Sequence, residues 1–220
     1  MEKDRIRETV ARLKKYYSTL VSHLGGMEEN PFEILISTVL SQRTKDANTE
    51  RATEALFSVY RTPEEIAKAP LKRIEKLIYG SGFYKTKAKR VKRISTQLIE
   101  RFGGKVPADI ESLLSLPGVG RKTANCVLVY AYRVPSIPVD THVHRISNRL
   151  GWVKTKAPEK TEEELVKIIP RDLWIEINEL FVLHGQNICL PRKPLCFKCP
   201  VESLCECPFK NLYSDSEKAS

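Results

Sequence analysis

The sequence has no run of 18 apolar residues, so it has no segment that could cross a membrane as an apolar helix. Residues 1–7 are mostly charged and lack the apolar core of a secretion signal. We therefore expect a protein of the cytoplasm or nucleoid with no membrane partner. A disulfide framework is not expected there, although the chain has six cysteines.

Strand signals are also scarce, and no internal repeat is found. Apolar residues recur at helical spacing along almost the whole chain, so the predicted fold class is all-α. With 220 residues, the chain can form one large domain or two small ones. Only the tail after Cys207 is expected to be disordered.

Basic residues exceed acidic ones by 37 to 27, which gives a net charge of +10. This excess indicates a polyanionic partner, with nucleic acid first, although many basic proteins bind nothing specific. An amphipathic helix that ends at Gly103-Gly104 is expected to have a basic outer face. A solvated face is the ordinary explanation, but the aromatic pair Phe83-Tyr84 beside it favours contact with bases. The residues assigned to that face are Lys85, Lys87, Lys89, Arg90, Lys92 and Arg93.

Capping signals predict several helix ends. Asn30-Pro31 should begin one helix, and residues 62–65 form a capping box. Residues 161–164 form a second predicted capping box. A helix over residues 172–184 should be closed by Gly185.

Residues 116–126 predict two helices joined by a tight glycine turn. Gly118 and Gly120 are expected to allow positive φ, and the second helix should begin near Arg121. Backbone N–H groups and the helix dipole would then favour a phosphate at that N-terminus. An ordinary helical hairpin, with glycines that only shape the turn, is the alternative.

Lys122 falls in the first turn of this second helix. The helix dipole disfavours a protonated amine there, and a neutral lysine is what Schiff-base chemistry requires. A solvated lysine that contacts the same phosphate would occupy the same position. Both interpretations stay open on position alone.

Five of the six cysteines fall within residues 189–207. A compact thiolate cluster in a loop-rich segment predicts a metal site, and either zinc or a [4Fe–4S] cluster accepts four thiolates. The usual zinc pattern has two short pairs, whereas this segment has one. Cys126 is expected to be a buried apolar residue, and Cys207 is a spare neighbour or an alternative ligand. The expected ligands are Cys189, Cys196, Cys199 and Cys205.

Asp140 follows an extended segment, residues 134–139, that contains two prolines. It is placed to cap the next helix, which is a structural role.

Together, these features resemble the endonuclease III-type DNA glycosylases of the helix-hairpin-helix superfamily. The resemblance covers residues 5–207 and includes residues 116–125, 139–142, 184–186 and the cysteine spacing. It implies a [4Fe–4S] cluster instead of zinc. It also implies two helical domains with a DNA-binding cleft between them. Nothing in the sequence indicates an oligomer, so we expect a monomer. The expected domains are a six-helix barrel with the hairpin (24–134), and an N/C-terminal domain (1–23 and 135–220) with the cluster loop (189–205).

The resemblance assigns Lys122 as the nucleophile and Asp140 as the essential carboxylate. It implies a bifunctional DNA glycosylase/AP lyase that removes oxidised or ring-saturated pyrimidines through a lysine Schiff base. The partner would be double-stranded DNA with damaged bases or abasic sites, cut 3′ to the abasic site by β-elimination. The alternatives are a glycosylase for mispaired adenine, thymine or uracil, and a non-enzymatic DNA-binding module.

The same resemblance places DNA contacts on four segments. Phe83 matches an apolar wedge, and Arg43 stands where a glutamine is common in the loop that contacts the orphaned base. Arginine cannot accept hydrogen bonds, so the opposite-base preference is left open. The full set of expected DNA contacts is Gln42, Arg43, Phe83, Tyr84, Gly118, Val119, Gly120, Arg121, Arg192 and Lys193.

Overall fold

The computed structural model describes residues 2–21, 30–208 and 210. All regular structure in this part of the chain is helical, which confirms the predicted all-α class. Backbone contacts divide the chain into two compact units, Glu28–Val134, and Met1–Met27 with Pro135–Ser220.

The unit 28–134 contains seven helices in its described residues. Local signals set several starts: the Asn30 side chain accepts a hydrogen bond from Phe32 N, and Thr62 and Glu65 form the predicted capping box. The helices are α3 (Pro31–Ser41), α4 (Asp46–Phe57), α5 (Pro63–Lys68), α6 (Leu71–Leu77), α7 (Tyr84–Phe102), α8 (Ile110–Leu114) and α9 (Arg121–Tyr132).

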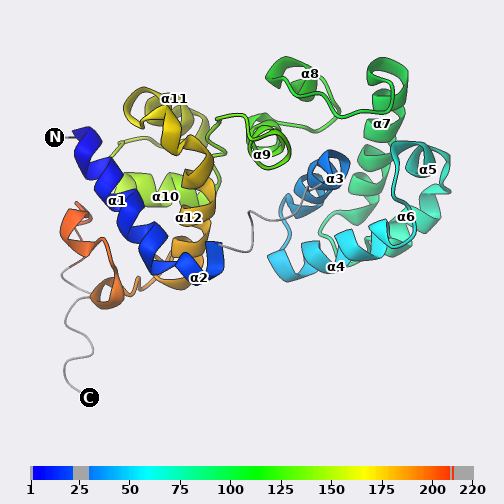
Figure 1. Ribbon diagram of the computed structural model, residues 1–220. Coiled ribbons are helices and arrows are strands. Elements are labelled where there is room, and N and C mark those ends of the chain that lie inside the picture. The colour runs from blue at the N-terminus through cyan, green and yellow to red at the C-terminus, as the bar shows by residue number, and fades with distance from the viewer. Residues whose placement is uncertain (1, 22–29, 209, 211–220) are drawn as a thin grey trace. The chain divides into compact units, whose positions relative to one another are not determined.

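Helix α3 is the centre of this unit. It packs against α4, α7 and α9, while α5 and α6 lie along α7 (Figure 1). Its apolar residues point in several directions, as expected for a helix surrounded by others. The buried side chains of α3 are Phe32, Ile34, Leu35, Ile36, Val39 and Leu40.

The other unit joins the N-terminal helix to the second half of the chain. Helix α12 packs against both α1 and α10 (Figure 1). Its core includes one face of α1, on which Ile6, Val10 and Leu13 are almost fully buried. The elements are α1 (Glu2–Tyr16), α2 (Ser18–Val21), α10 (Thr141–Arg149), α11 (Pro158–Ile168), α12 (Trp174–Asn187) and the short 3₁₀ turns Arg171–Leu173, Cys196–Lys198 and Glu202–Leu204.

Two predicted helix ends in this unit are wrong. Helix α11 begins at Pro158, so Thr161 lies inside the helix and donates back to Ala157 O instead of capping a start. Helix α12 continues through Gly185 to Asn187. A Cβ at Gly185 would overlap with the His142 ring, so this glycine serves the close approach of α10 and α12.

No helix in the described residues is long and apolar enough to cross a membrane. The disorder expected after Cys207 concerns a segment that lies almost entirely outside the described part of the chain.

Candidate functional site

Helices α8 and α9 form the predicted hairpin, joined by a turn that contains Gly118 and Gly120. Asp109 caps α8, and α9 begins at Arg121. Gly118 has φ +75°, and a Cβ there would overlap with the Arg90 side chain of α7. Gly120 has φ −97°, so the predicted positive φ is wrong at this position. Gly120 is instead the N-cap of α9, where open space surrounds it.

The N-terminus of α9 is suited to an anion. Gly120 has no side chain that could cap the first turn, and both Gly118 and Gly120 are exposed. Val119 between them is buried and anchors the turn, and Arg121 is exposed. Lys122 is half-buried in the first turn of the helix, next to the buried Thr123.

Two further loops bring Arg43 and Phe83 together. Both side chains are exposed, and the Arg43 Cζ lies 5.9 Å from the centroid of the Phe83 ring. Tyr84, the first residue of α7, is half-buried and packs against Tyr79 with ring centroids 4.9 Å apart.

Gln42 lies beside Arg43 but bonds within the protein. Its Nε2 donates to Gly118 O at 3.1 Å and to Thr123 Oγ1 at 3.3 Å. Its Oε1 accepts a bond from Arg90 Nη1 at 2.7 Å. The amide therefore ties the 41–46 loop to the hairpin, which sequence reasoning did not foresee.

The basic face of α7 is smaller than predicted. Lys87 is 3% exposed, and Arg90 and Lys92 are half-buried. Lys87 shares a stripe with Val91 and Ile94, at the spacing that marks the buried side of a helix. That spacing was the signal available in the sequence, and the assignment of Lys87 to the outer face is wrong.

In the other unit, Asp140 caps α10 as the sequence predicted. Its Oδ1 accepts hydrogen bonds from His142 N and Val143 N, both at 2.8 Å. Just before it, Pro138 O accepts a bond from the buried Asn178 side chain at 2.8 Å. The carboxyl group is half-buried and held at a fixed helix start.

The cysteine segment encloses a cavity. Cys189, Cys196, Cys199 and Cys205 all line it, together with the buried Cys207. Burial raises the pKa of the Cys196 thiol to about 11 and that of Cys199 to about 12, and the charges of Cys189 and Cys205 add to both rises. The four cysteines therefore face one shared cavity. Within the described residues, no three His, Cys, Asp or Glu side chains are arranged to hold a metal ion.

Hydrogen bonds also reach the sulfur atoms. Arg149 Nη1 donates to Cys189 Sγ at 3.3 Å, and Cys207 N donates to Cys205 Sγ at 3.5 Å. His184 Nε2 lies 3.6 Å from Cys199 Sγ. Burial, with the charge of Arg145, lowers the pKa of His184 to about 4, so its ring is neutral near pH 7.

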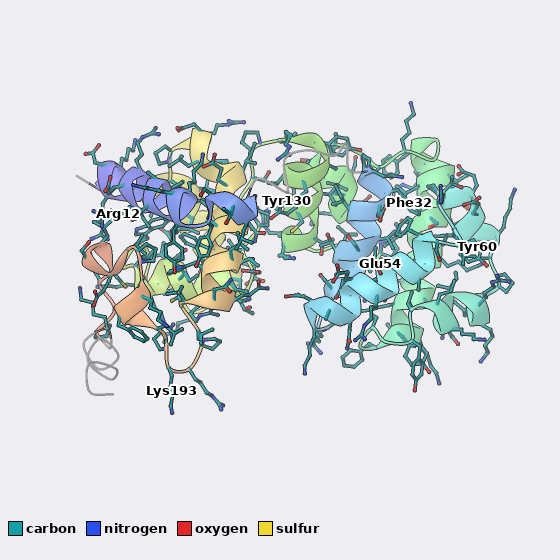
Figure 2. All side chains as sticks on the ribbon, turned by 60° about the horizontal axis from the view of Figure 1, so that its bottom comes forward. Arg12, Phe32, Glu54, Tyr60, Tyr130 and Lys193 are labelled. Carbon is teal, nitrogen blue, oxygen red and sulfur yellow. The ribbon has the colours of Figure 1, made fainter. Side chains whose placement is uncertain are left out.

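Arg192 and Lys193 occupy the turn between the first two cysteines, and both are exposed. Figure 2 shows the Lys193 side chain pointing away from the ribbon at the end of this turn. Its backbone is left-handed, with φ 51°. Arg149 fixes the base of the turn by donating to Leu190 O and Pro191 O.

Residues 36–171 match the family described as "HhH-GPD superfamily base excision DNA repair protein". The chain belongs to this superfamily. Endonuclease III of Thermotoga maritima is 57% identical over 179 residues, covering 81% of this chain and 84% of the relative. Endonuclease III of Escherichia coli is 36% identical over 206 residues, covering 94% and 97%.

Solved structures of the superfamily agree with the fold. A trapped endonuclease III–DNA covalent intermediate is 37% identical, with a TM-score of 0.85 over 96% of this chain and 98% of that one. A thermostable thymine-DNA glycosylase is 25% identical, with a TM-score of 0.82 over 96% and 97%. The predicted family and enzyme class, a base excision repair DNA glycosylase/AP lyase, are confirmed.

Sequence reasoning missed several residues that support the site of this superfamily member. Lys87 and Arg90 fix the loops of one unit, and Arg145 and Arg149 fix the cysteine segment of the other. His184 was noted only as part of a motif. Nothing in the sequence says which backbone carbonyl a given arginine will reach, because those carbonyls lie far along the chain.

Proposed function

We propose that this chain removes an oxidised or ring-saturated pyrimidine from double-stranded DNA and then cuts the strand 3′ to the abasic site. The observation that carries the proposal is the position of Lys122, half-buried in the first turn of α9 directly after the glycine turn. Lysine in such a position forms a covalent imine once its amine is neutral.

The first step exchanges one bond for another at the sugar. The neutral Lys122 Nζ attacks C1′ of the damaged nucleotide, and the glycosidic bond breaks with its electron pair leaving on the base. The base takes up a proton and departs. Opening of the sugar ring then gives an imine between Nζ and C1′.

Asp140 is the proton acceptor in this step and stabilises positive charge. Its Oδ1 is held by two backbone N–H groups, which fixes the carboxylate at the start of α10. The negative carboxylate accepts the proton that Lys122 loses and stabilises positive charge developing on the sugar.

Strand cutting follows from the imine. Loss of a proton from C2′ moves electrons toward the imine, and the C3′–O bond breaks with the 3′ phosphate as leaving group. Water then hydrolyses the remaining imine and frees Lys122. A hydroxyl nucleophile at this position would not permit these steps, because it cannot form an imine.

The damaged nucleotide must leave the base stack before Lys122 can reach its sugar. Phe83 is the apolar wedge for the vacated space, with Arg43 and Tyr84 beside it. Because Gln42 bonds to Gly118 and Arg90, we assign it a supporting role and Arg43 the contact with the orphaned base.

Phosphates are held at two exposed turns. Gly118, Val119, Gly120 and Arg121 offer backbone N–H groups and charge at the start of α9, without base readout. Arg192 and Lys193 offer positive charge on a turn that Arg149 keeps rigid.

We assign a [4Fe–4S] cluster to Cys189, Cys196, Cys199 and Cys205. Four thiols around one cavity, with N–H groups directed at their sulfurs, match the donor set of such a cluster. A single zinc ion fits less well, because the usual zinc pattern has two short cysteine pairs and this segment has one. When bound, the cluster supplies a rigid covalent link across the segment, and no step of the reaction needs it as a reactant.

Borohydride trapping on a duplex with one oxidised pyrimidine tests the proposal. The wild type should form a covalent protein–DNA adduct, and Lys122→Gln should form none and cut no strand. Base release without an adduct would indicate the mismatch-type glycosylase instead. An adduct that persists in Lys122→Gln would overturn the assignment of the nucleophile.

A further inference from the structure

Arg43 and Phe83 share an unusual backbone state. Their φ angles are 52° and 58°, in the left-handed region that side chains other than glycine rarely adopt. Such residues persist only where the surrounding contacts hold them. Contacts with the rest of the protein must therefore hold the two loops that carry Arg43 and Phe83.

The loops are packed backbone against backbone. A Cβ added to Gly82 would lie 2.7 Å from Arg43 O, so only glycine allows this approach. Gly82 N donates to Thr44 Oγ1 at 3.1 Å. The loop before α4 and the loop before α7 thus form one surface.

Lys87 lies at the base of that surface. Its Nζ donates to Leu40 O at 2.6 Å, to Thr44 Oγ1 at 2.6 Å and to Ser81 Oγ at 3.0 Å. Three acceptors match the three donors of an ammonium group. One acceptor comes from the end of α3 and one from each loop, so a single side chain joins all three segments.

We propose that Lys87 is a positioning residue that holds Arg43 and Phe83 in register for extrusion of the damaged nucleotide. This inference rests on the proposed function. The side chain is 3% exposed, so it acts on DNA only through the two loops.

The energetics favour positioning over general stability. The three bonds of Lys87 go to neutral oxygens and none goes to a carboxylate. Burial of a cation without an opposite charge costs free energy, and this cost offsets part of what the three hydrogen bonds contribute to stability. What an apolar side chain cannot do is direct three hydrogen bonds at three segments.

Lys92 provides a matched control on the same helix. Its Nζ donates two hydrogen bonds, both to backbone carbonyls, Ala67 O at 2.7 Å and Ala69 O at 2.5 Å. Those carbonyls lie at the end of α5, so these two bonds do not reach the loops that carry Arg43 and Phe83. Lys87→Met and Lys92→Met therefore remove comparable bonds from different places.

The experiment compares both variants on two substrates. One substrate is a duplex with an oxidised pyrimidine, which requires extrusion, and the other is a single-stranded abasic oligonucleotide, which does not. Lys87→Met should lower kcat/KM on the duplex about tenfold or more, as expected for misplaced recognition groups. Its cutting of the abasic strand should stay close to wild type, and Lys92→Met should resemble wild type on both.

A double-mutant cycle with Phe83→Ala tests whether Lys87 acts through the wedge. In the Phe83→Ala background, adding Lys87→Met should lower kcat/KM on the duplex by less than about twofold. If the two residues acted independently, their separate losses would multiply. Equal losses for Lys87→Met on both substrates, or multiplied effects in the cycle, would overturn the inference. Failure of the wild type to form the Lys122 adduct would count against the proposed function instead.

If Lys87→Met does not fold, Thr44→Val replaces it. This variant keeps the lysine and removes the acceptor that joins the two loops. It should show the same loss on the duplex and the same activity on the abasic strand. Wild-type activity of Thr44→Val on the duplex would contradict the inference.

Discussion

Gly118 and Gly120 are two residues apart but have different requirements. Gly118 combines a left-handed φ of +75° with a neighbouring Arg90 side chain that leaves no room for a Cβ. Gly120 has an ordinary φ and open space around it. Glycine is thus required by backbone and packing at position 118, whereas no atom within 4 Å would exclude a Cβ at position 120.

We expect Gly118→Ala to lower the free energy of unfolding by about 1–3 kcal/mol, because alanine is strained at this φ and displaces Arg90. Gly120→Ala should leave stability close to wild type. Because the proposed phosphate site requires close approach to Gly120, the same variant should weaken binding to duplex DNA. Denaturant unfolding and a binding titration separate the two effects, and equal stabilities of the two variants would contradict the prediction.

The burial of Lys87 leads us to expect that stability depends on pH. Burial, with the charge of Arg90, lowers its pKa from 10.5 to about 8 in the folded protein. Between these values, the unfolded chain holds a proton that the native state lacks, so stability should rise with pH. The free energy of unfolding, measured near pH 7 and near pH 10, should therefore rise more in the wild type than in Lys87→Met. Parallel curves would rule out the lowered pKa.

At this scale the sequence predicts local position better than contacts. Lys122 and Asp140 occupy the predicted starts of helices, in the first turn of α9 and at the N-cap of α10. Their catalytic roles stay predictions. Gln42 is predicted to contact DNA, and the structure adds bonds to Gly118 and Arg90 that the sequence does not predict. Its partners lie 76 and 48 residues away, so local pattern could not reveal them.

At the scale of elements, the start of α10 combines an observed cap and a proposed catalytic role in one residue. Asp140 Oδ1 satisfies two N–H groups of the first turn, and the same carboxyl group is the proposed proton acceptor. Asparagine also caps helices well but cannot take the proton. The two functions can therefore be separated by choice of side chain.

Asp140→Asn should keep stability near wild type and lower the rate of base excision about 100-fold or more. Asp140→Ala should lose the same activity and, in addition, about 1 kcal/mol of stability through the lost cap. Thermal unfolding and single-turnover excision give the two readouts. A clearly less stable Asp140→Asn would mean that the cap depends on the charge.

Helix boundaries were predictable where side chains and backbone interact locally. The capping box at Thr62 is an example, because all of its partners lie within four residues. Prediction failed at Thr161 and Gly185 for different reasons. Pro158 begins α11 three residues before the expected box, and Gly185 is needed for packing against His142 inside a continuing helix.

For the whole molecule, the two units each have their own buried apolar core. One core lies entirely within residues 32–128, and the other joins Ile6 to Val201. Periodicity predicted most of the buried stripes, since helical spacing marks them directly. It could not show that the first helix packs with the last third of the chain, because that contact joins segments about 170 residues apart, as Tyr17 and His184 illustrate.

The cysteine segment belongs to only one of these cores. Cys189, Cys199 and Cys205 pack against the core that contains Ile6 and Phe181, and the other core has no part in it. Loss of the cluster should therefore affect the two units unequally, because a metal centre stabilises the fold that holds its ligands.

Cys199→Ser should lose the iron and the visible absorption of an iron–sulfur cluster. Amide hydrogen exchange should then accelerate in residues 2–16 and 141–205, while residues 31–132 keep their protection. The reason is that serine is a poor ligand for iron, whereas α3 and α7 lie in a core without cysteine ligands. Cys126→Ser serves as the control, since Cys126 is buried in α9 outside the segment and should leave the iron content unchanged. Uniform acceleration across both units would show that they unfold as one, and full iron content in Cys199→Ser would exclude Cys199 as a ligand.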